Sequence, residues 1–511
     1  MNLPTPSVEY GALSPMLIVF GAAIVGVVVE AFLPRRSRYG IQLVLSVGAL
    51  ILALVAVIAL AGTRSAAVGG AVAVDGPTLF LQGTILLIGV LAILIIAERR
   101  TDGGLQGFTP QASATPGSVA QIEATRAGVA QTEVFPLTMF ALGGMLLFPA
   151  ANDLLTMFVA LEVFSLPLYL LCGLARRRRV LSQEAALKYF LLGAFSSAIF
   201  LYGSALLYGY AGTLTLTGIG DAVAADPGNV LLALVGMGLL SVGVLFKVGA
   251  VPFHSWIPDV YQGAPTPITA FMAAATKIAA FGAMLRIFYV ALPGLRDDWR
   301  PVFWAVATLT MVAGSVMVVT QTDIKRMLAY SAVAQAGFIL MGVVAANGAG
   351  LSSTLFYLVA YGFSALGAFA VLTLVRAPDG EEDSELARWA GLGRRAPLFG
   401  VLFSVFLLAF AGIPLTSGFA AKFAVFKAAG ESGAIPLVIV GVLASAIAAF
   451  VYVRVIVLMF FAAPYRDGPE VATPSSLTAT AILVGVVVTV LFGILPQPLL
   501  DLARNAGAFL H

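Results

Sequence analysis

The sequence has 511 residues, of which 60% are hydrophobic and 10% are charged, and its net charge at pH 7 is +3. Soluble domains carry about 25% charged residues, so this composition excludes a protein that faces water on all sides. The small net charge gives no reason to expect a nucleic-acid partner. One cysteine (Cys172) and two histidines (His254 and His511) exclude an iron–sulfur cluster, a structural zinc site or a disulfide framework within this chain.

Apolar runs of 18 or more residues recur along the whole chain, and each is long enough to cross a hydrocarbon core of roughly 30 Å. A bilayer admits only helices or closed barrels, and these runs lack the two-residue alternation of barrel strands. We therefore predict an all-α polytopic membrane protein of about fourteen transmembrane helices. The predicted spans are 13–33, 41–62, 77–97, 134–150, 154–174, 183–210, 228–262, 265–291, 302–320, 327–346, 353–375, 397–429, 435–462 and 477–496.

Basic residues are unevenly divided between the two sets of alternate loops. One set holds 17 of them and the other, with the C-terminal tail, holds 4. The positive-inside rule places the richer set in the cytoplasm and both termini on the non-cytoplasmic side. The richer set comprises Arg35, Arg36, Arg38, Arg99, Arg100, Arg126, Arg176 to Arg179, Lys325, Arg326, Arg376, Arg388, Arg394, Arg395 and Arg466.

Two predicted spans exceed 30 residues, and each contains a helix breaker near its middle. The breakers are Gly249-Ala-Val-Pro252 in the span 228–262 and Ala411-Gly412-Ile-Pro414 in the span 397–429. Broken helices at membrane depth line polar cavities, and a pair of them in corresponding positions indicates an internal repeat. The two spans are five apart and run in opposite directions. We therefore predict two inverted five-helix repeats, spans 4–8 (134–291) and spans 9–13 (302–462).

The remaining parts follow from the same span assignment. Residues 1–100 form an N-terminal three-helix segment, and 477–496 is a C-terminal span. The stretch 101–133 is rich in Gly, Gln, Ala, Thr and Ser, which predicts a flexible cytoplasmic loop. The acidic stretch 379–385 is interpreted as a solvated loop.

Seven basic residues fall within the predicted spans, where a charge at the bilayer centre costs about 2.5–3.5 kcal/mol. Snorkelling or a structural ion pair is the favoured interpretation for three of them. Those three are Arg286, Lys427 and Arg454, and the other four are Lys188, Lys247, Lys277 and Lys422.

Glu162, Lys247, Lys277 and Lys422 favour a functional interpretation, because each lies deep within a span or beside a break. Burial favours the neutral form of a lysine, whereas a nearby carboxylate favours the charged form. A lysine whose partner approaches and recedes can therefore load and release a proton. Arginine could not do this, because it stays charged.

Three further residues are candidates for the same path. His254 titrates near neutrality and suits a relay, with a structural histidine as an equal alternative. Asp259 follows the first break. Lys188 either joins the path or ends its span near the cytoplasm.

Several segments resemble a known family. Val251-Pro-Phe-His-Ser-Trp-Ile-Pro-Asp-Val-Tyr-Gln-Gly-Ala-Pro-Thr-Pro267 is similar to the broken-helix segment of the antiporter-like subunits of respiratory complex I. Leu161-Glu-Val-Phe-Ser-Leu-Pro167 and Leu187-Lys-Tyr-Phe-Leu-Leu-Gly-Ala-Phe-Ser-Ser197 resemble the subunit N branch more specifically. Asp323-Ile-Lys-Arg-Met-Leu-Ala-Tyr-Ser331 resembles a segment shared across the wider family.

The resemblance implies a non-redox membrane subunit of a proton-translocating NADH–quinone oxidoreductase in a bacterial inner (plasma) membrane. It places NADH, flavin, iron–sulfur clusters and quinone in partner subunits, with no cofactor in this chain. The expected partners are other membrane subunits, further antiporter-like subunits among them, and lipids.

The resemblance also implies roles for individual residues. Glu162 and Lys247 form a modulating pair, Lys277 and His254 an internal link, and Lys422 the terminal site. The chain departs from the family at Gln335, where a histidine is frequent, and it ends about 15 residues after the last span, without the long lateral helix of subunit L. Two other hypotheses stay open, namely a subunit of a multi-subunit cation/proton antiporter and a structural scaffold with inert ion pairs.

Overall fold

The structure is a computed structural model that describes residues 8–100, 107–127, 130–225, 230–464 and 467–510. The chain begins with three long helices, α1 (Tyr10–Phe32), α2 (Arg35–Ala59) and α3 (Gly76–Ile96). Between α2 and α3, strand β1 (Ser65–Ala67) pairs antiparallel with β2 (Val72–Val74), with Ser65 opposite Val74. Asp75 ends this hairpin and caps α3 by accepting a hydrogen bond from the Thr78 backbone N–H (3.1 Å).

The next region contains the first broken helix, and its short 3₁₀ and π turns are labelled η. Its elements are α4 (Val119–Arg126), α5 (Val134–Leu147), η2 (Phe148–Ala150), α6 (Leu154–Cys172), α7 (Arg179–Ala211), α8 (Leu216–Ala225), α9 (Leu231–Val248), α10 (Trp256–Gly263), α11 (Thr266–Phe271), η3 (Met272–Thr276), α12 (Lys277–Arg286), η4 (Ile287–Ala291) and η5 (Pro293–Leu295). The four elements from α11 to η4 form one continuous rod, Thr266–Ala291.

The last region contains the second broken helix. Its elements are α13 (Arg296–Val319), α14 (Ile324–Ala345), α15 (Gly348–Leu372), β3 (Val375–Arg376), η6 (Leu386–Trp389), α16 (Leu392–Arg395), α17 (Pro397–Ala411), α18 (Ser417–Glu431), α19 (Ile435–Phe461), β4 (Glu470–Val471), α20 (Ser476–Ile494) and α21 (Gln497–Asn505). Strands β3 and β4 pair antiparallel.

The predicted membrane fold is confirmed. Within the described residues, 12 helices are long and apolar enough to cross a membrane. The other two predicted spans are the shorter helix Val134–Ala150 and the pair α17 and α18. The two small sheets and α8 are elements that the sequence did not predict. The chain is a multi-pass membrane protein.

Both predicted breaks are present. Helix α9 ends at Val248 before α10 begins at Trp256, and α17 ends at Ala411 before α18 begins at Ser417. Gly249 and Gly412 follow the two helix ends with φ of 77° and 79°. This left-handed conformation carries no steric cost for glycine and terminates a helix. The inverted relation between the two repeats remains a prediction.

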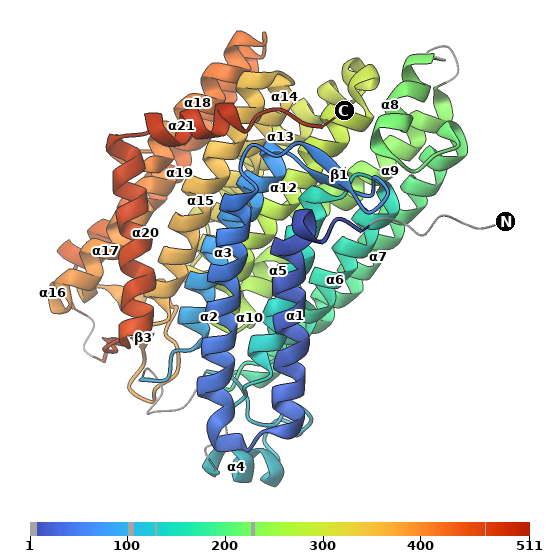
Figure 1. The fold of residues 1–511 in the computed structure, drawn as a ribbon. Coiled ribbons are helices and arrows are strands. Elements are labelled where there is room, and N and C mark those ends of the chain that lie inside the picture. The colour runs from blue at the N-terminus through green and yellow to red at the C-terminus, as the bar shows by residue number, and fades with distance from the viewer. Residues whose placement is uncertain (1–7, 101–106, 128–129, 226–229, 465–466, 511) are drawn as a thin grey trace.

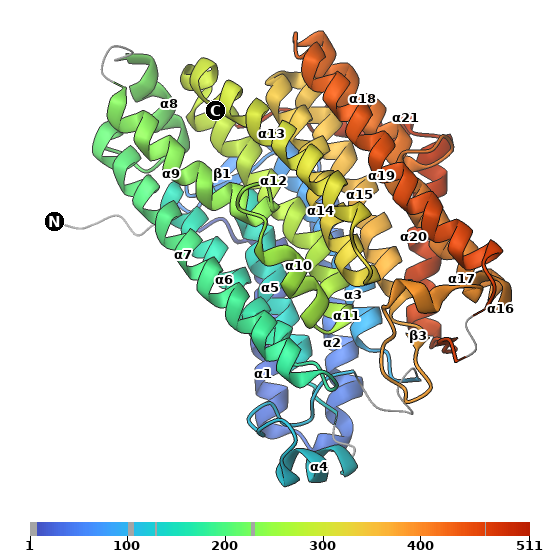
Figure 2. The same ribbon diagram turned by 180° about the vertical axis from the view of Figure 1, so that it is seen from behind.

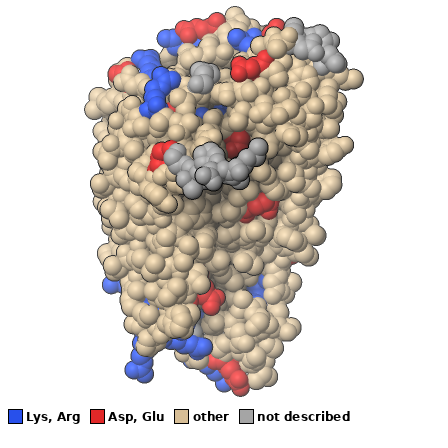
Figure 3. Space-filling view, turned by 45° about the vertical axis from the view of Figure 1, so that its right-hand side comes forward, with Lys and Arg blue, Asp and Glu red and all other residues tan. Residues whose placement is uncertain are grey.

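The helices stand side by side, with α7 and α9 at one edge and α18, α19 and α20 at the other (Figures 1 and 2). The rod Thr266–Ala291, α14 and α15 are the most deeply enclosed helices. Large apolar side chains are exposed on the outer helices, among them Val44, Phe195 and Phe450. Figure 3 shows Lys and Arg near the two ends of the molecule and a broad middle with few charged side chains, as lipid contact requires.

The end of the molecule that carries α4, β3 and the start of α7 is called the basic end below (Figure 1). Arg35, Arg36 and Arg38 lie in the first turn of α2 at this end, not in the loop before it, because the helix begins earlier than predicted. The assignment of the basic end to the cytoplasm remains a prediction from the positive-inside rule.

Part of the predicted flexible loop 101–133 is packed against the start of α7. The guanidinium of Arg179 donates hydrogen bonds to the Thr109 hydroxyl and to the carbonyls of Gln111, Ala112 and Ala114. Helix α4 follows within the same stretch. Residues 101–106 and 128–129 lie outside the described residues.

Candidate functional site

Lys247 lies at the end of α9, next to the first break, and its residue is only 3% exposed. Its ammonium donates a hydrogen bond of 2.7 Å to the Ser165 hydroxyl. Four aromatic rings surround it at 5.2–5.9 Å, those of Phe164, Tyr169, Tyr189 and Phe246. Ring faces attract a cation, so they partly replace the water that the ammonium has lost.

Glu162 lies on α6, one helical turn before Ser165, and therefore on the same side of the helix. The Oε1 atom of Glu162 is buried and accepts no hydrogen bond from the described residues. Lys247 lies within range of its charge, but the two side chains are not within the 4.0 Å of a direct ion pair. The direct partner of Lys247 is therefore the Ser165 hydroxyl and not the Glu162 carboxylate.

Lys277 begins α12 in the centre of the protein and is 1% exposed. Its ammonium donates a hydrogen bond to the Ala332 carbonyl of α14, and the Tyr361 ring lies 5.4 Å away. The π turn η3 directly precedes it, and such turns are frequent at functional sites. No carboxylate of the described chain lies within 4.0 Å of this ammonium.

Gln335 lies on α14 between the acceptor of Lys277 and a carbonyl that also binds Lys422. It follows Ala332 by one turn of α14 and is 2% exposed. Its amide nitrogen donates to the Phe410 carbonyl (3.1 Å), and its amide oxygen accepts from the Tyr357 hydroxyl (2.5 Å). The Phe410 carbonyl also accepts a hydrogen bond from Lys422 (2.8 Å). The residue that departs from the family pattern thus lies within the buried polar line.

Lys422 lies in α18 after the second break and is 5% exposed. Besides the Phe410 carbonyl, its ammonium donates to the Ala411 carbonyl (3.1 Å) and to the Ser445 hydroxyl (2.8 Å). The Phe338 ring lies 4.6 Å from it. The two carbonyls belong to the last turn of α17, whose acceptors lack partners within the helix. The ammonium therefore caps the negative end of the α17 dipole.

His254 lies in the first break and is half-buried. Its Nδ1 atom is buried and has no hydrogen-bond partner among the residues that the structure describes. The ring centroid lies 6.4 Å from that of Tyr330 on α14, the helix that also carries Ala332 and Gln335. Its role as a relay remains a prediction.

Asp259 and Lys188 do not join the buried lysines. Asp259 accepts from Lys188 (2.7 Å) and from Arg326 (2.7 Å), and Lys188 also pairs with Glu184 (2.7 Å). The side chains of Asp259, Lys188 and Arg326 are 31–42% exposed. Ion pairs this accessible to water contribute little energy. They join α7, α10 and α14, and the place of Lys188 and Asp259 on the path remains a prediction.

The three residues interpreted as structural or snorkelling match that interpretation. Arg286 is fully buried, as is its partner Asp75, and donates to both carboxylate oxygens of Asp75 (2.7 and 2.9 Å). Burial raises the pKa of Asp75, but the charge and hydrogen bonding of Arg286, together with hydrogen bonds from the Leu510 backbone and Thr78, lower it more, so the pKa lies below its ordinary value. Lys427 pairs with Glu431 at 3.8 Å on the surface, and Arg454 is exposed.

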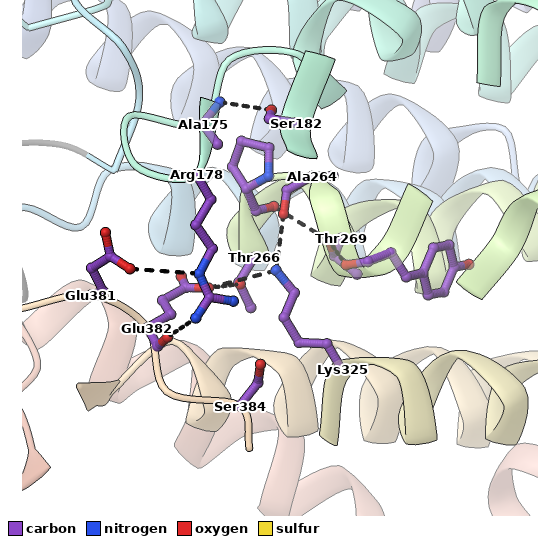
Figure 4. Close-up of polar contacts among 12 residues, drawn as sticks. Ala175, Arg178, Ser182, Ala264, Thr266, Thr269, Lys325, Glu381, Glu382 and Ser384 are labelled. Carbon is purple, nitrogen blue, oxygen red and sulfur yellow. Dashed lines mark hydrogen bonds and ion pairs between the residues drawn. The ribbon is translucent and has the colours of Figure 1, made fainter. Parts of the chain in front are cut away.

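A second buried cluster at the basic end was missed by the sequence analysis. Lys325, counted there as a loop residue, is 3% exposed in the first turn of α14. Its ammonium donates to the Ala264 carbonyl (3.0 Å) and lies 3.6 Å from the Glu382 carboxylate, which also accepts from the Thr266 hydroxyl (Figure 4).

The interpretation of 379–385 as a solvated loop is wrong for three of its residues, Glu382, Asp383 and Ser384, the last of which is only 2% exposed. The Glu382 side chain is 23% exposed and that of Asp383 only 5%. Cations from other segments draw the stretch inward, because Lys325 and Arg376 lie near the Glu382 carboxylate and Arg388 pairs with Asp383. The sequence signal that could have indicated this cluster is the motif Asp323–Ser331. It contains Lys325, for which the sequence had predicted no role.

No group of three or more His, Cys, Asp or Glu side chains that could hold a metal ion occurs among the described residues. The expectation that this chain carries no cofactor stays a prediction.

Residues 151–448 match the model of the family described as NADH:quinone oxidoreductase/Mrp antiporter, transmembrane. The chain is 71% identical to the NADH-quinone oxidoreductase subunit N of Rhodococcus opacus (strain B4), over 99% of this chain and 97% of the relative. It is 64% identical to the protein of that name from Mycobacterium tuberculosis (strain ATCC 25618 / H37Rv), over 100% of both chains.

Two solved structures are similar over nearly the whole chain. A chain of respiratory complex I from Thermus thermophilus with bound aureothin has a TM-score of 0.78 and 31% identity, covering 96% of this chain and 99% of that one. A chain of the Mrp complex from Dietzia sp. DQ12-45-1b has a TM-score of 0.81, covering 98% and 97%, but its 22% identity shows likeness of fold alone.

Proposed function

Since this chain belongs to the family of NADH-quinone oxidoreductase subunit N, the antiporter-like membrane subunit of respiratory complex I, we propose that it carries protons across the membrane along its buried lysines. The driving force is electron transfer from NADH to quinone in partner subunits. The proposal rests on the burial of Lys247, Lys277 and Lys422 and on the groups that contact their ammonium nitrogens. All three are at most 5% exposed, and within the described chain none has a carboxylate in direct contact.

This arrangement suits proton transfer better than a static role. A buried ammonium that serves structure is normally neutralised by a fixed carboxylate, as Arg286 is by Asp75. The three lysines rely instead on hydroxyls, carbonyls and ring faces, which support the charged form without locking it. Lysine, unlike arginine, can then lose its proton when its surroundings change.

The residues divide the work as follows. Glu162 approaches or leaves Lys247 and so changes the affinity of Lys247 for a proton. Lys277 is the central site. Gln335 lies one turn beyond Ala332, the acceptor of Lys277, and shares the Phe410 carbonyl with Lys422. His254 exchanges protons between the first break and α14.

The assembly follows from the family. The partners are other membrane subunits of the complex, including further antiporter-like subunits, and the chain itself contributes no redox centre. Both termini face away from the cytoplasm of a bacterial inner membrane, as the distribution of basic residues predicts.

The decisive experiment replaces Lys277 and, separately, Lys422 by leucine in the assembled complex. Proton uptake into inverted membrane vesicles is measured per NADH oxidised, with Lys427→Ala as the control because Lys427 is an exposed lysine paired on the surface. Both leucine variants are expected to lose most of the uptake. Full uptake by either one in properly assembled complex contradicts the proposal and leaves a structural scaffold.

A cation/proton antiporter is the second candidate, favoured by the family model, whose description also includes Mrp antiporters. Purification of the chain with its native partners separates the two. Flavin and iron–sulfur proteins in the purified complex support the oxidoreductase, whereas small hydrophobic proteins alone support the antiporter.

A further inference from the structure

A cavity of about 60 Å³ lies at the basic end, between the α10–α11 turn, the start of α14 and the segment 379–386. Its polar lining includes Glu98, Arg178, Thr266, Lys325 and Glu382. A cavity needs roughly 10–15 Å³ to hold one water molecule that has polar partners, so this one has room for several. The cavity lining contains none of the five ionisable residues of the proposed path, which are Glu162, Lys247, His254, Lys277 and Lys422.

The segment 379–386 contributes Glu382 to the cavity lining and is tied to the start of α14. The Ile324 backbone N–H donates to the Ser384 carbonyl (2.7 Å), and the Leu386 N–H donates to the Thr322 carbonyl (2.8 Å). Arg178 holds the segment from the other side through the Glu382 carbonyl (2.9 Å; Figure 4). These contacts hold the Glu382 carboxylate near the Lys325 ammonium. Glu382 itself lies in a segment between membrane spans.

Two helices lead from this cavity to Lys277. Lys325 and Ala332 are seven residues apart on α14, so they lie on one face, about 10 Å apart along the axis. The Ala332 carbonyl is the hydrogen-bond acceptor of Lys277. Thr266 opens the rod that contains Lys277 eleven residues later, about 16 Å away. The cavity therefore lies at the outer end of the α14 face that contacts Lys277.

We propose that this cavity is the entrance for protons at the basic end and that the Glu382–Lys325 ion pair is its gate. The inference rests on the proposed function. A proton from water adds to the Glu382 carboxylate, which becomes a neutral carboxylic acid and releases its hold on the Lys325 ammonium. Lys325 can then leave the Ala264 carbonyl, turn along α14 and give its proton to a neutral Lys277. The neutral Lys325 amine returns and takes the proton of Glu382, so that the ion pair is restored and one proton has moved from water to Lys277.

The charges around Glu382 set the resting state of the gate. Lys325 on α14, Arg376 on β3 and Arg178 before α7 all face it, and the Thr266 hydroxyl donates to it. Burial raises the pKa of Glu382, but these cations and the hydroxyl lower it more, so the pKa lies below its ordinary value. The carboxylate is therefore charged, and the gate closed, until a proton arrives.

The test compares Glu382→Gln with Glu381→Gln in assembled complex, with proton uptake per NADH measured in vesicles from pH 6 to 8. Glutamine still accepts from Thr266 but has no charge to release. Glu381 is the matched control, since its side chain is 39% exposed and lies 3.8 Å from Arg178. We expect about threefold or greater loss and a changed pH profile for Glu382→Gln, with recovery in Glu382→Asp, and little change for Glu381→Gln.

A double variant covers the case in which Glu382→Gln assembles poorly because Lys325 is left unpaired. Adding Lys325→Gln removes that charge, and a true gate pair predicts that the double variant pumps no worse than either single one. Normal uptake with an unchanged pH profile in Glu382→Gln overturns the gate. If Lys277→Leu has meanwhile stopped pumping, the proposed function survives that result, whereas full pumping by Lys277→Leu removes the function itself.

Discussion

Lys247 and Lys422 lie beside the two broken helices, and both bury their ammonium groups, yet their surroundings differ. Lys247 precedes its break and makes one hydrogen bond, to a hydroxyl, among four aromatic rings. Lys422 follows its break and makes three hydrogen bonds, two of them to the carbonyls that end α17. The charge of the Glu162 carboxylate attracts the Lys247 ammonium, although the two groups form no direct ion pair.

The difference separates an adjustable site from a fixed one. The partners of Lys247 are side chains, which can rotate without disturbing a helix. Two of the acceptors of Lys422 are carbonyls that move only with the last turn of α17, and the helix dipole there favours the charged form. We infer that the proton affinity of Lys247 is changed by Glu162, and that the proton affinity of Lys422 varies less.

The largest expected effect is that of Lys247→Ala. Removal of the adjustable ammonium should reduce NADH-driven proton uptake at least roughly tenfold, which corresponds to about 1.4 kcal/mol in the barrier. Uptake is measured in vesicles at equal amounts of assembled complex, with Lys427→Ala alongside. Stoichiometric pumping by Lys247→Ala would show that Lys247 does not control proton uptake. It would also contradict the contrast drawn between Lys247 and Lys422.

A smaller and more selective effect is expected at Lys422. Arginine retains the charge that caps α17, so Lys422→Arg should assemble in normal amounts but pump several-fold more slowly, because arginine does not release its proton. Lys422→Leu should assemble in smaller amounts, since the α17 carbonyls are left without a donor, and the complex that does assemble should lose most of its proton uptake. Equal assembly of the two variants would show that the cap is unimportant.

The smallest expected effect on the pH dependence of stability concerns Asp75. Its ion pair with Arg286 is fully buried, and it is the structural ion pair with which Lys247 and Lys422 are compared. The folded pKa of Asp75 lies below the ordinary 3.8, so the pair stabilises the protein fully above that value. The contribution of this pair to thermal stability should therefore be complete and constant between pH 5 and 8, and should fall only as the pH drops below 3.8. In Asp75→Asn that acid-dependent loss should diminish, and an unchanged acid profile would mean that other carboxylates dominate.

The sequence predicted those parts of the fold that depend on local signals. Long apolar runs gave the spans, and the Gly249 and Gly412 segments gave both breaks, since glycine and proline act on the chain at their own positions. The β1–β2 hairpin and α8 lie outside the spans, where hydropathy carries no information. Lys325 was placed in a loop because helix ends are poorly marked when a charge occurs in the first turn.

The site was predicted as a set of residue types but not as a set of contacts. Burial of Lys247, Lys277 and Lys422 followed from their apolar neighbours. Their acceptors did not, because two of the three lysines bind backbone carbonyls, which every residue possesses. The contact between Glu382 and Lys325 joins two segments that are distant in the sequence. No hydrophobic periodicity relates them, so no pattern in the sequence predicts the contact.

The contacts of Asp75 reach far along the chain. Besides Arg286, its carboxylate accepts a hydrogen bond from the backbone N–H of Leu510, 435 residues later, and Arg64 donates to the Phe509 carbonyl. At a ribosomal rate of about 5–20 residues per second, roughly 20 to 90 s separate the synthesis of these partners. The N-terminal helices therefore enter the bilayer long before this cluster can close, which gives the biogenesis machinery a time window in which to hold them.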